Sequence, residues 1–210
     1  MLEMQGKEIK NILFDLGNVL IDLHMPRFEE QVIKVFGRNY CEVCADLASV
    51  FEHFERGNIS EVLFINALVK YCGGNINANQ IVHAWNSILG NIPVERLEML
   101  LNLRQKYKVF LFSNTNCTHI DQLHRILVRE HQLQDFEEKY FDKVYYSHKI
   151  HMCKPDPESF LFIAADAGFH PNETLFIDDL PQNIAGAASV GYHVMQHDPQ
   201  KDITKILLQL

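Results

Sequence analysis

Short apolar runs that alternate with helical patterns dominate this sequence. Four runs are clear, at residues 12–14, 109–112, 144–146 and 175–177, and a fifth at 192–195 is weaker. Continuous apolar runs of this length are typical of strands buried on both faces of a parallel sheet. Helical spacing over 94–106 and 118–131, and a helix start at Asp156-Pro157-Glu158, fill the gaps between them. The pattern predicts an α/β protein with a doubly wound parallel sheet.

One interval interrupts the alternation. Between residues 26 and 92 there are no strand-like runs, and the segments 28–36, 40–54, 60–71 and 79–89 all have helical spacing. Glycines separate these segments, at Gly37, Gly57 and the Gly73-Gly74 pair. We therefore expect a helical bundle inserted after the first strand. The predicted organisation is an α/β core of residues 1–23 and 93–210, with a helical domain of residues 24–92.

Composition narrows the possible partners. The 210 residues are 47% hydrophobic and 22% charged, as in a globular protein, and the net charge of -8 disfavours nucleic acid as a partner. No apolar stretch reaches the ~18 residues of a membrane span, and the polar first ten residues do not resemble a signal peptide. The expectation is a cytoplasmic protein, monomeric or dimeric, that does not bind membranes.

The cysteines do not indicate a disulfide framework. There are five, an odd number without regular spacing, which is typical of reduced thiols. Cys41 and Cys44 form a CxxC, the spacing of a redox or zinc pair. No second CxxC or histidine pair accompanies them, so we interpret them as ordinary helix residues.

Polar residues follow the apolar runs, where ligands bind in a doubly wound sheet. The runs stop at Asp15, Ser113, Ser147 and the Asp178-Asp179 pair. Carboxylates gathered at one sheet edge repel one another unless a cation lies among them, and Mg²⁺ is the usual cation beside phosphate. Ser113 and the adjacent Asn114 could hydrogen-bond a phosphoryl oxygen. Lys154, in a loop made rigid by prolines, could add positive charge, although each residue alone also suits a turn or the surface.

Taken in order, these elements resemble the four motifs of the haloacid dehalogenase superfamily. They are Phe-Asp-Leu-Gly-Asn-Val at 14–19, Phe-Ser-Asn at 112–114, Lys154 in Lys-Pro-Asp-Pro, and Phe-Ile-Asp-Asp at 176–179 followed by Asn183. The inserted helices resemble the C1 cap of this superfamily. Residues 15–19, 54–60 and 113–116 are similar to the branch that contains α-glucose-1-phosphate phosphatase.

The resemblance implies a Mg²⁺-dependent phosphatase that acts on a small phosphorylated metabolite, with a sugar phosphate as the expected class. Asp15 would attack phosphorus and form an aspartyl phosphate, which water then hydrolyses. The metal ligands would be Asp15, the Gly17 carbonyl and Asp179, with Asp178 as a further ligand or acting through water. Ser113 and Lys154 would hold phosphoryl oxygens.

Gly17 departs from the family pattern. Most phosphatases of the superfamily have a second aspartate at this position, which protonates the leaving alcohol and then activates water. Such a general acid–base contributes ~10²–10⁴-fold in rate. Three explanations remain open: a slow enzyme, another acid such as Asp22 or His24, or a substrate with a good leaving group, such as an anomeric sugar phosphate.

Residues of the helical insert should determine the substrate. Arg27 and Arg56 are the candidates to bind a sugar or a second anion, whereas Trp85 is expected in the core of the insert. His119 follows the Ser-Asn-Thr-Asn stretch and could face either the active-site edge or solvent. Cys153 replaces an arginine that is frequent in the branch.

Two other functions remain as alternatives. The loss of the second aspartate is compatible with a non-catalytic, regulatory or binding protein of this fold. A haloacid dehalogenase would use Asp15 to attack carbon without a metal, but the Asp178-Asp179 pair would then have no role. A mutase is disfavoured, because mutases rely on the missing aspartate.

Overall fold

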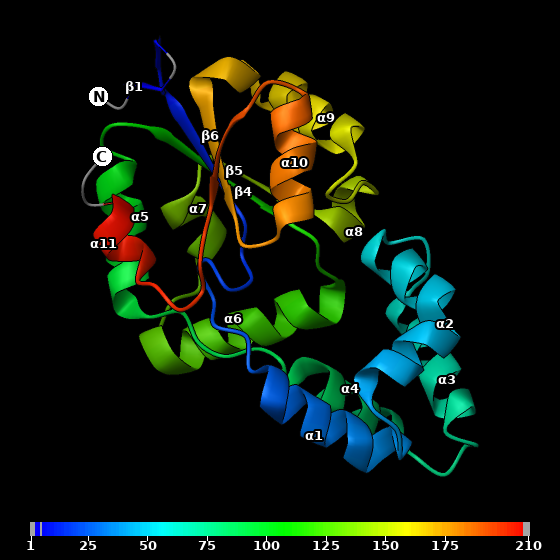
Figure 1. Ribbon diagram of the computed structural model, residues 1–210. Coiled ribbons are helices and arrows are strands. Elements are labelled where there is room, and N and C mark those ends of the chain that lie inside the picture. The colour runs from blue at the N-terminus through cyan, green and yellow to red at the C-terminus, as the bar shows by residue number, and fades with distance from the viewer. Residues whose placement is uncertain (1–2, 5, 208–210) are drawn as a thin grey trace.

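The computed structural model describes residues 3–4 and 6–207. Its main sheet, which Figure 1 shows between helices on either side, has five parallel strands in the order β5-β4-β3-β6-β7. These are β3 (Asn11–Phe14), β4 (Lys108–Ser113), β5 (Lys143–Tyr146), β6 (Thr174–Asp178) and β7 (His193–Gln196). The predicted α/β fold with a parallel sheet is confirmed, and all five predicted runs are strands. A short antiparallel pair, β1 (Glu3–Met4) and β2 (Lys7–Glu8), was not predicted.

Helices cover both faces of this sheet, which explains why the inner residues of each strand are apolar. One face packs on α5 (Val94–Leu103), α6 (Cys117–His131), α7 (Phe136–Tyr140) and α11 (Ile203–Leu207). The other packs on α9 (Pro157–Ala167) and α10 (Pro181–Ser189). Successive strand residues alternate between the faces: Phe14 belongs to the first core and Leu13 to the second. Short helices α8 (Ser147–Ile150) and η1 (Pro171–Glu173) complete this unit.

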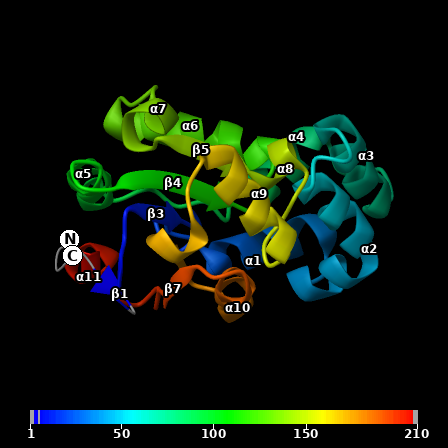
Figure 2. The ribbon, with the colours of Figure 1, turned by 90° about the horizontal axis from the view of Figure 1, so that it is seen from above.

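The segment between β3 and α5 forms a separate helical bundle, which lies beside the sheet unit in Figures 1 and 2. It contains α1 (Met25–Phe36), α2 (Tyr40–Glu55), α3 (Glu61–Tyr71) and α4 (Ala78–Asn86). Asn39, Ser60 and Asn77 cap α2, α3 and α4. The bundle has a core of its own, rich in aromatic residues, against which Trp85 packs. Among the described residues, no helix is long and apolar enough to cross a membrane.

Two linkers join the bundle to the sheet unit, and we call them the neck (residues 22–24 and 88–91). They pair with each other: His24 N donates to Ile88 O at 2.7 Å, and Gly90 N donates to Asp22 O at 2.8 Å. A Cβ at position 90 would lie 2.6 Å from Asp22 O, so only glycine permits this close pairing. The neck is therefore a short two-stranded connection.

Candidate active site

The predicted motifs meet at the carboxyl edge of the sheet. Asp15 directly follows β3, Ser113 ends β4 and Asp178 ends β6, so parallel pairing brings their side chains to one edge. Lys154 enters the same edge from the loop after α8. Among the described residues, the one cluster of acidic, histidine or cysteine side chains that could share a metal is Asp15, Asp178 and Asp179. Cys41 and Cys44 belong to no such cluster.

Lys154 lies at the centre of this group. Its side chain is 1% exposed, and its Nζ lies 2.5 Å from Asp15 Oδ1 and 2.7 Å from Asp178 Oδ2. Burial opposes the charged form, but the two carboxylates outweigh it and raise the pKa of Lys154. The lysine thus stays protonated, and it is not a surface residue.

Asn114 fixes the backbone of Lys154. Its Nδ2 donates to Lys154 O at 2.8 Å, and Lys154 N donates to its Oδ1 at 2.9 Å. The side chain that we considered for substrate binding is therefore engaged in holding the lysine loop. Substrate binding by Asn114 remains a prediction.

Asp178 is fully buried and its carboxylate is saturated with hydrogen bonds. It accepts from Lys154, from Leu180 N at 2.8 Å and from Asn183 Nδ2 at 3.0 Å. Donors on both oxygens orient the carboxylate toward the lysine. The structure thus gives Asp178 a role in positioning Lys154, while its part in metal binding stays a prediction.

Asp15 and Asp179 supply the charge that a cation would compensate. Burial raises the pKa of Asp15 to about 6, against the favourable charge of Lys154. Carboxylate oxygens of Asp15, Asp178 and Asp179 lie within 4.8 Å of one another, and one lysine leaves an excess of negative charge. Asn18 Nδ2 donates to Asp179 Oδ2 at 2.9 Å and orients it. This donor set fits a hard divalent cation.

A side chain at Gly17, the position of the missing aspartate, would have room beside Asp15. A Cβ built at Gly17 would lie 3.9 Å from Asp15 Oδ2 and 3.1 Å from the end of the Leu23 side chain. The two candidate replacements have other partners. Asp22 pairs with Arg96 at 2.8 Å, and His24 packs against Gly90 in the neck.

The tip of the bundle rests on the sheet unit beside Lys154. Arg56 pairs with Asp156 at 2.9 Å, and Ser147 Oγ donates to Glu55 O at 2.7 Å. A Cβ at Gly57, where φ is +66°, would lie 2.1 Å from a carbonyl oxygen, that of His148. This contact depends on glycine, and it places Arg56 near the lysine loop, paired with an acidic residue; substrate binding by Arg56 stays a prediction.

Arg27 and His119 have structural contacts away from the carboxylates. Arg27 Nε donates to Ser87 O at 2.6 Å, and the hollow that Arg27 lines includes neither Asp15 nor Lys154. His119 Nε2 donates to Trp85 O at 3.2 Å and stacks on its ring. Burial lowers the pKa of His119 to about 4, so the ring is neutral. His119 therefore faces α4 rather than open solvent.

Comparison with known proteins agrees with this geometry. The model of the haloacid dehalogenase-like hydrolase family matches residues 9–191. The chain belongs to this hydrolase family. A D-ribitol-5-phosphate phosphatase from Bacteroides thetaiotaomicron is 30% identical to the hydrolase, over 95% of this chain and 98% of the relative.

Two solved structures are also similar to the hydrolase. A family enzyme from Bacteroides thetaiotaomicron, in complex with magnesium and inorganic phosphate, is 36% identical, covers 94% of this chain and 98% of its own, and has a TM-score of 0.86. A HAD-like hydrolase from Porphyromonas gingivalis is 34% identical, covers 96% and 97%, and has a TM-score of 0.84. The family predicted from the four motifs is confirmed.

Two positioning residues of the hydrolase were not among the sequence candidates. Asn18 orients Asp179, and its φ of +56° within the first motif is a conformation that asparagine tolerates well. Ser147 accepts from Thr115 N at 2.9 Å and so connects the second motif to the bundle tip. Its place at a strand end was visible in the sequence, but its partners were not.

Proposed function

We propose that this hydrolase is a Mg²⁺-dependent phosphatase in which Asp15 accepts the phosphoryl group of a small phosphorylated metabolite. The observation that carries the proposal is the buried Lys154 ammonium, which bridges Asp15 and Asp178 beside Asp179. A lysine held on the nucleophile can bind the anionic group that the nucleophile attacks. The magnesium and phosphate complex of the relative supports the same chemistry.

The first step is attack of an Asp15 carboxylate oxygen on phosphorus. The bond from phosphorus to the ester oxygen breaks, and the leaving oxygen must take up a proton. Lys154 and the Ser113 hydroxyl hold the phosphoryl oxygens and balance charge in the transition state. Asp15, Asp179 and the Gly17 carbonyl would hold Mg²⁺, which supplies further charge compensation when bound.

In the second step, water attacks the phosphorus of the aspartyl phosphate and releases phosphate and the Asp15 carboxylate. Gly17 has no side chain to activate this water or to protonate the leaving group. Asp22 is paired with Arg96, and His24 lies in the neck, so neither is a good substitute. The arrangement favours substrates whose leaving oxygen needs little help from an acid.

Residues 24–92 would act as the cap of this site. The bundle has its own core and meets the sheet unit at the narrow neck, at the tip around Gly57 and at the start of α6, where His119 stacks on Trp85. A rigid bundle on a narrow connection can move as a unit. Closure of the tip over Lys154 would exclude bulk water during phosphoryl transfer.

The substrate class that we infer is a phosphorylated sugar or polyol. The curated relative acts on D-ribitol 5-phosphate, a polyol phosphate, and it spans nearly the whole chain. The similarity to the α-glucose-1-phosphate phosphatase branch, which favours an anomeric phosphate, stays a prediction. The two possibilities differ in the acidity of the leaving oxygen.

Phosphate release tests the proposal directly. The protein would be incubated with Mg²⁺ and ribitol 5-phosphate, glucose 1-phosphate or glucose 6-phosphate, with Asp15→Asn as the matched control. We expect release with the wild type, its loss with EDTA, and its loss in Asp15→Asn. Absence of release from every sugar and polyol phosphate, or full activity of Asp15→Asn, would refute the proposal.

A further inference from the structure

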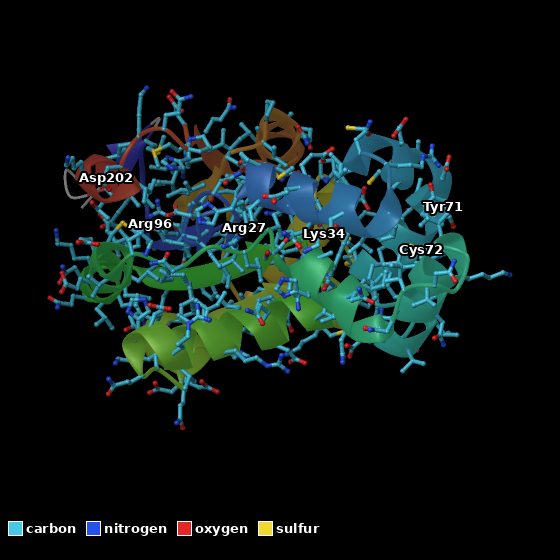
Figure 3. The ribbon with its side chains drawn as sticks, turned by 90° about the horizontal axis from the view of Figure 1, so that it is seen from below. Arg27, Lys34, Tyr71, Cys72, Arg96 and Asp202 are labelled. Atoms are coloured by element: carbon cyan, nitrogen blue, oxygen red, sulfur yellow. The ribbon has the colours of Figure 1, made fainter. Side chains whose placement is uncertain are left out.

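We propose that a groove beside the neck is a second binding site, specific for a small phosphate-bearing anion. The groove has a volume of about 660 Å³ and lies between α1 and α4 of the bundle and α6 of the sheet unit. Residues of the neck, including His24 and Gly90, form part of its wall. Figure 3 views the molecule from this side, with Arg27 labelled. The proposal does not rest on the phosphatase activity.

The groove is positively charged in an acidic protein. Arg27, Arg125 and Arg129 line it, and Glu130 is the single acidic residue among the described residues of its lining, although the chain carries a net charge of -8. Five of the seven arginines in the sequence pair with a carboxylate: Arg38, Arg56, Arg96, Arg104 and Arg129. Arg27 and Arg125 have no ion pair among the described residues, and both lie here. Unpaired guanidinium groups gather at this one place.

The Arg27 guanidinium group is fixed in place while its charge remains available to an anion. Its Nε donates to Ser87 O at 2.6 Å, and a second guanidinium nitrogen donates to Leu89 O. These carbonyls fix the side chain but are neutral, so they leave its charge uncompensated. Planar guanidinium groups match the oxygens of phosphate, often with two parallel hydrogen bonds.

A buried acceptor in the same wall suggests that the ligand also carries hydroxyl groups. Asn86 is 9% exposed, and its Oδ1 has no hydrogen-bond donor among the described residues. Buried amide oxygens without a donor are uncommon in folded proteins. A hydroxyl of a phosphorylated ligand could supply the donor, which a bare inorganic anion does not.

A ligand in this groove would connect the bundle to the sheet unit. Arg27 belongs to α1 and Arg125 to α6, on opposite sides of the groove. At the two ends of α6, His119 donates to Trp85 O and His131 donates to Ile92 O at 2.8 Å, so the helix already borders both the bundle and the segment that follows the second linker. Binding would stabilise this arrangement and restrict opening of the neck.

Calorimetric titration with inorganic pyrophosphate tests the site, in EDTA so that no metal recruits phosphate to Asp15. We expect wild-type binding that Arg125→Gln weakens about tenfold or more, the loss from one charge-assisted contact. The matched control Arg38→Gln removes the same charge from an exposed ion pair on the bundle and should bind as the wild type does. Ser113→Ala, altered in the active site, should also bind normally.

Hydrogen exchange of the Asp22, His24 and Gly90 amides reports on the neck. We expect slower exchange with pyrophosphate in the wild type and no change in Arg125→Gln. Absence of binding, equal weakening in Arg125→Gln and Arg38→Gln, or loss of binding in Ser113→Ala would overturn the site. Binding that depends on Arg125 but leaves neck exchange unchanged would overturn the connecting role.

Discussion

Replacing Gly17 with aspartate tests the inference that this enzyme works without a general acid. The new Cβ would lie 3.9 Å from Asp15 Oδ2, so the added carboxyl group would sit beside the nucleophile. Its nearest obstacle is the Leu23 Cδ1 at 3.1 Å, the end of a flexible side chain that can shift by a few tenths of an ångström. The backbone therefore admits the aspartate that most family phosphatases carry.

The size of the effect depends on the leaving group. A well-placed general acid–base contributes ~10²–10⁴-fold, or about 3–5 kcal/mol of barrier. Ribitol 5-phosphate and glucose 6-phosphate leave as simple alcohols, so their kcat/KM should rise about 100-fold or more in Gly17→Asp. Glucose 1-phosphate leaves as a more acidic hemiacetal oxygen, so its kcat/KM should rise less than about tenfold.

The added carboxylate of Gly17→Asp should also destabilise the folded protein when no metal is bound. A further carboxylate on a Cβ that lies 3.9 Å from Asp15 Oδ2 adds on the order of 1–4 kcal/mol of repulsion without a cation. We expect Gly17→Asp to unfold at a lower temperature than the wild type in EDTA and to recover with Mg²⁺. Thermal unfolding with and without the metal measures this difference.

Steady-state phosphate release with the three esters is the decisive assay, and Gly17→Asn is the matched control. Asparagine has nearly the same shape and cannot transfer the proton. An equal change for all three esters would refute the leaving-group reasoning. An equal gain in Gly17→Asn and Gly17→Asp would show that the added side chain acts by something other than proton transfer.

Three further predictions concern metal, cap and pH. Asn18→Gly removes the hydrogen bond to Asp179, but glycine suits the positive φ at this position. In a metal titration the apparent Mg²⁺ affinity should therefore fall about 10–100-fold, while the thermal stability stays the same. An unchanged Mg²⁺ affinity would contradict this prediction. Gly57→Ala should lower kcat/KM because its Cβ would lie 2.1 Å from the carbonyl oxygen of His148 in the sheet unit. The control Gly37→Ala has a similar φ but meets none of the described residues within 4 Å, so it should leave kcat/KM unchanged. The pKa of His119 is lowered to about 4, so its ring stays neutral in the folded state. In the unfolded chain the ring has its usual pKa of 6.5 and takes up a proton below that pH. The contribution of His119 to stability should therefore be lost as the pH falls from 6.5 toward 4. Denaturant unfolding should show that the loss of stability between pH 7.5 and pH 5 is about 2 kcal/mol smaller in His119→Gln than in the wild type.

Much of the fold was predictable because buried strands and helices each require a recognisable pattern of apolar residues in the sequence. Strands covered on both faces must be apolar at every position, and each of the five runs became a strand of the parallel sheet. The bundle helices were predictable from helical spacing and from the glycines between them. The pair β1 and β2 has two residues in each strand, which is too short to leave a pattern.

The part of the site at the carboxyl edge of the sheet was predictable from the same strand pattern. Parallel strands place their carboxyl ends together, so Asp15, Ser113 and Asp178 had to meet once the runs were strands. Lys154 could be predicted only through its resemblance to a family motif. Its loop lies 139 residues beyond Asp15, and spacing alone does not bring the two together.

By itself, then, the sequence determined the sheet, the helical insert, the acidic edge and the absence of a side chain beside the nucleophile at Gly17. Only the tertiary structure decided which partners each polar side chain has. Asn114 holds the lysine loop, Arg27 donates to the carbonyls of residues 87 and 89, and His119 packs on the bundle. Periodicity records whether a residue is buried, but a hydrogen bond depends on which distant carbonyl or carboxylate the folded chain brings within about 3 Å.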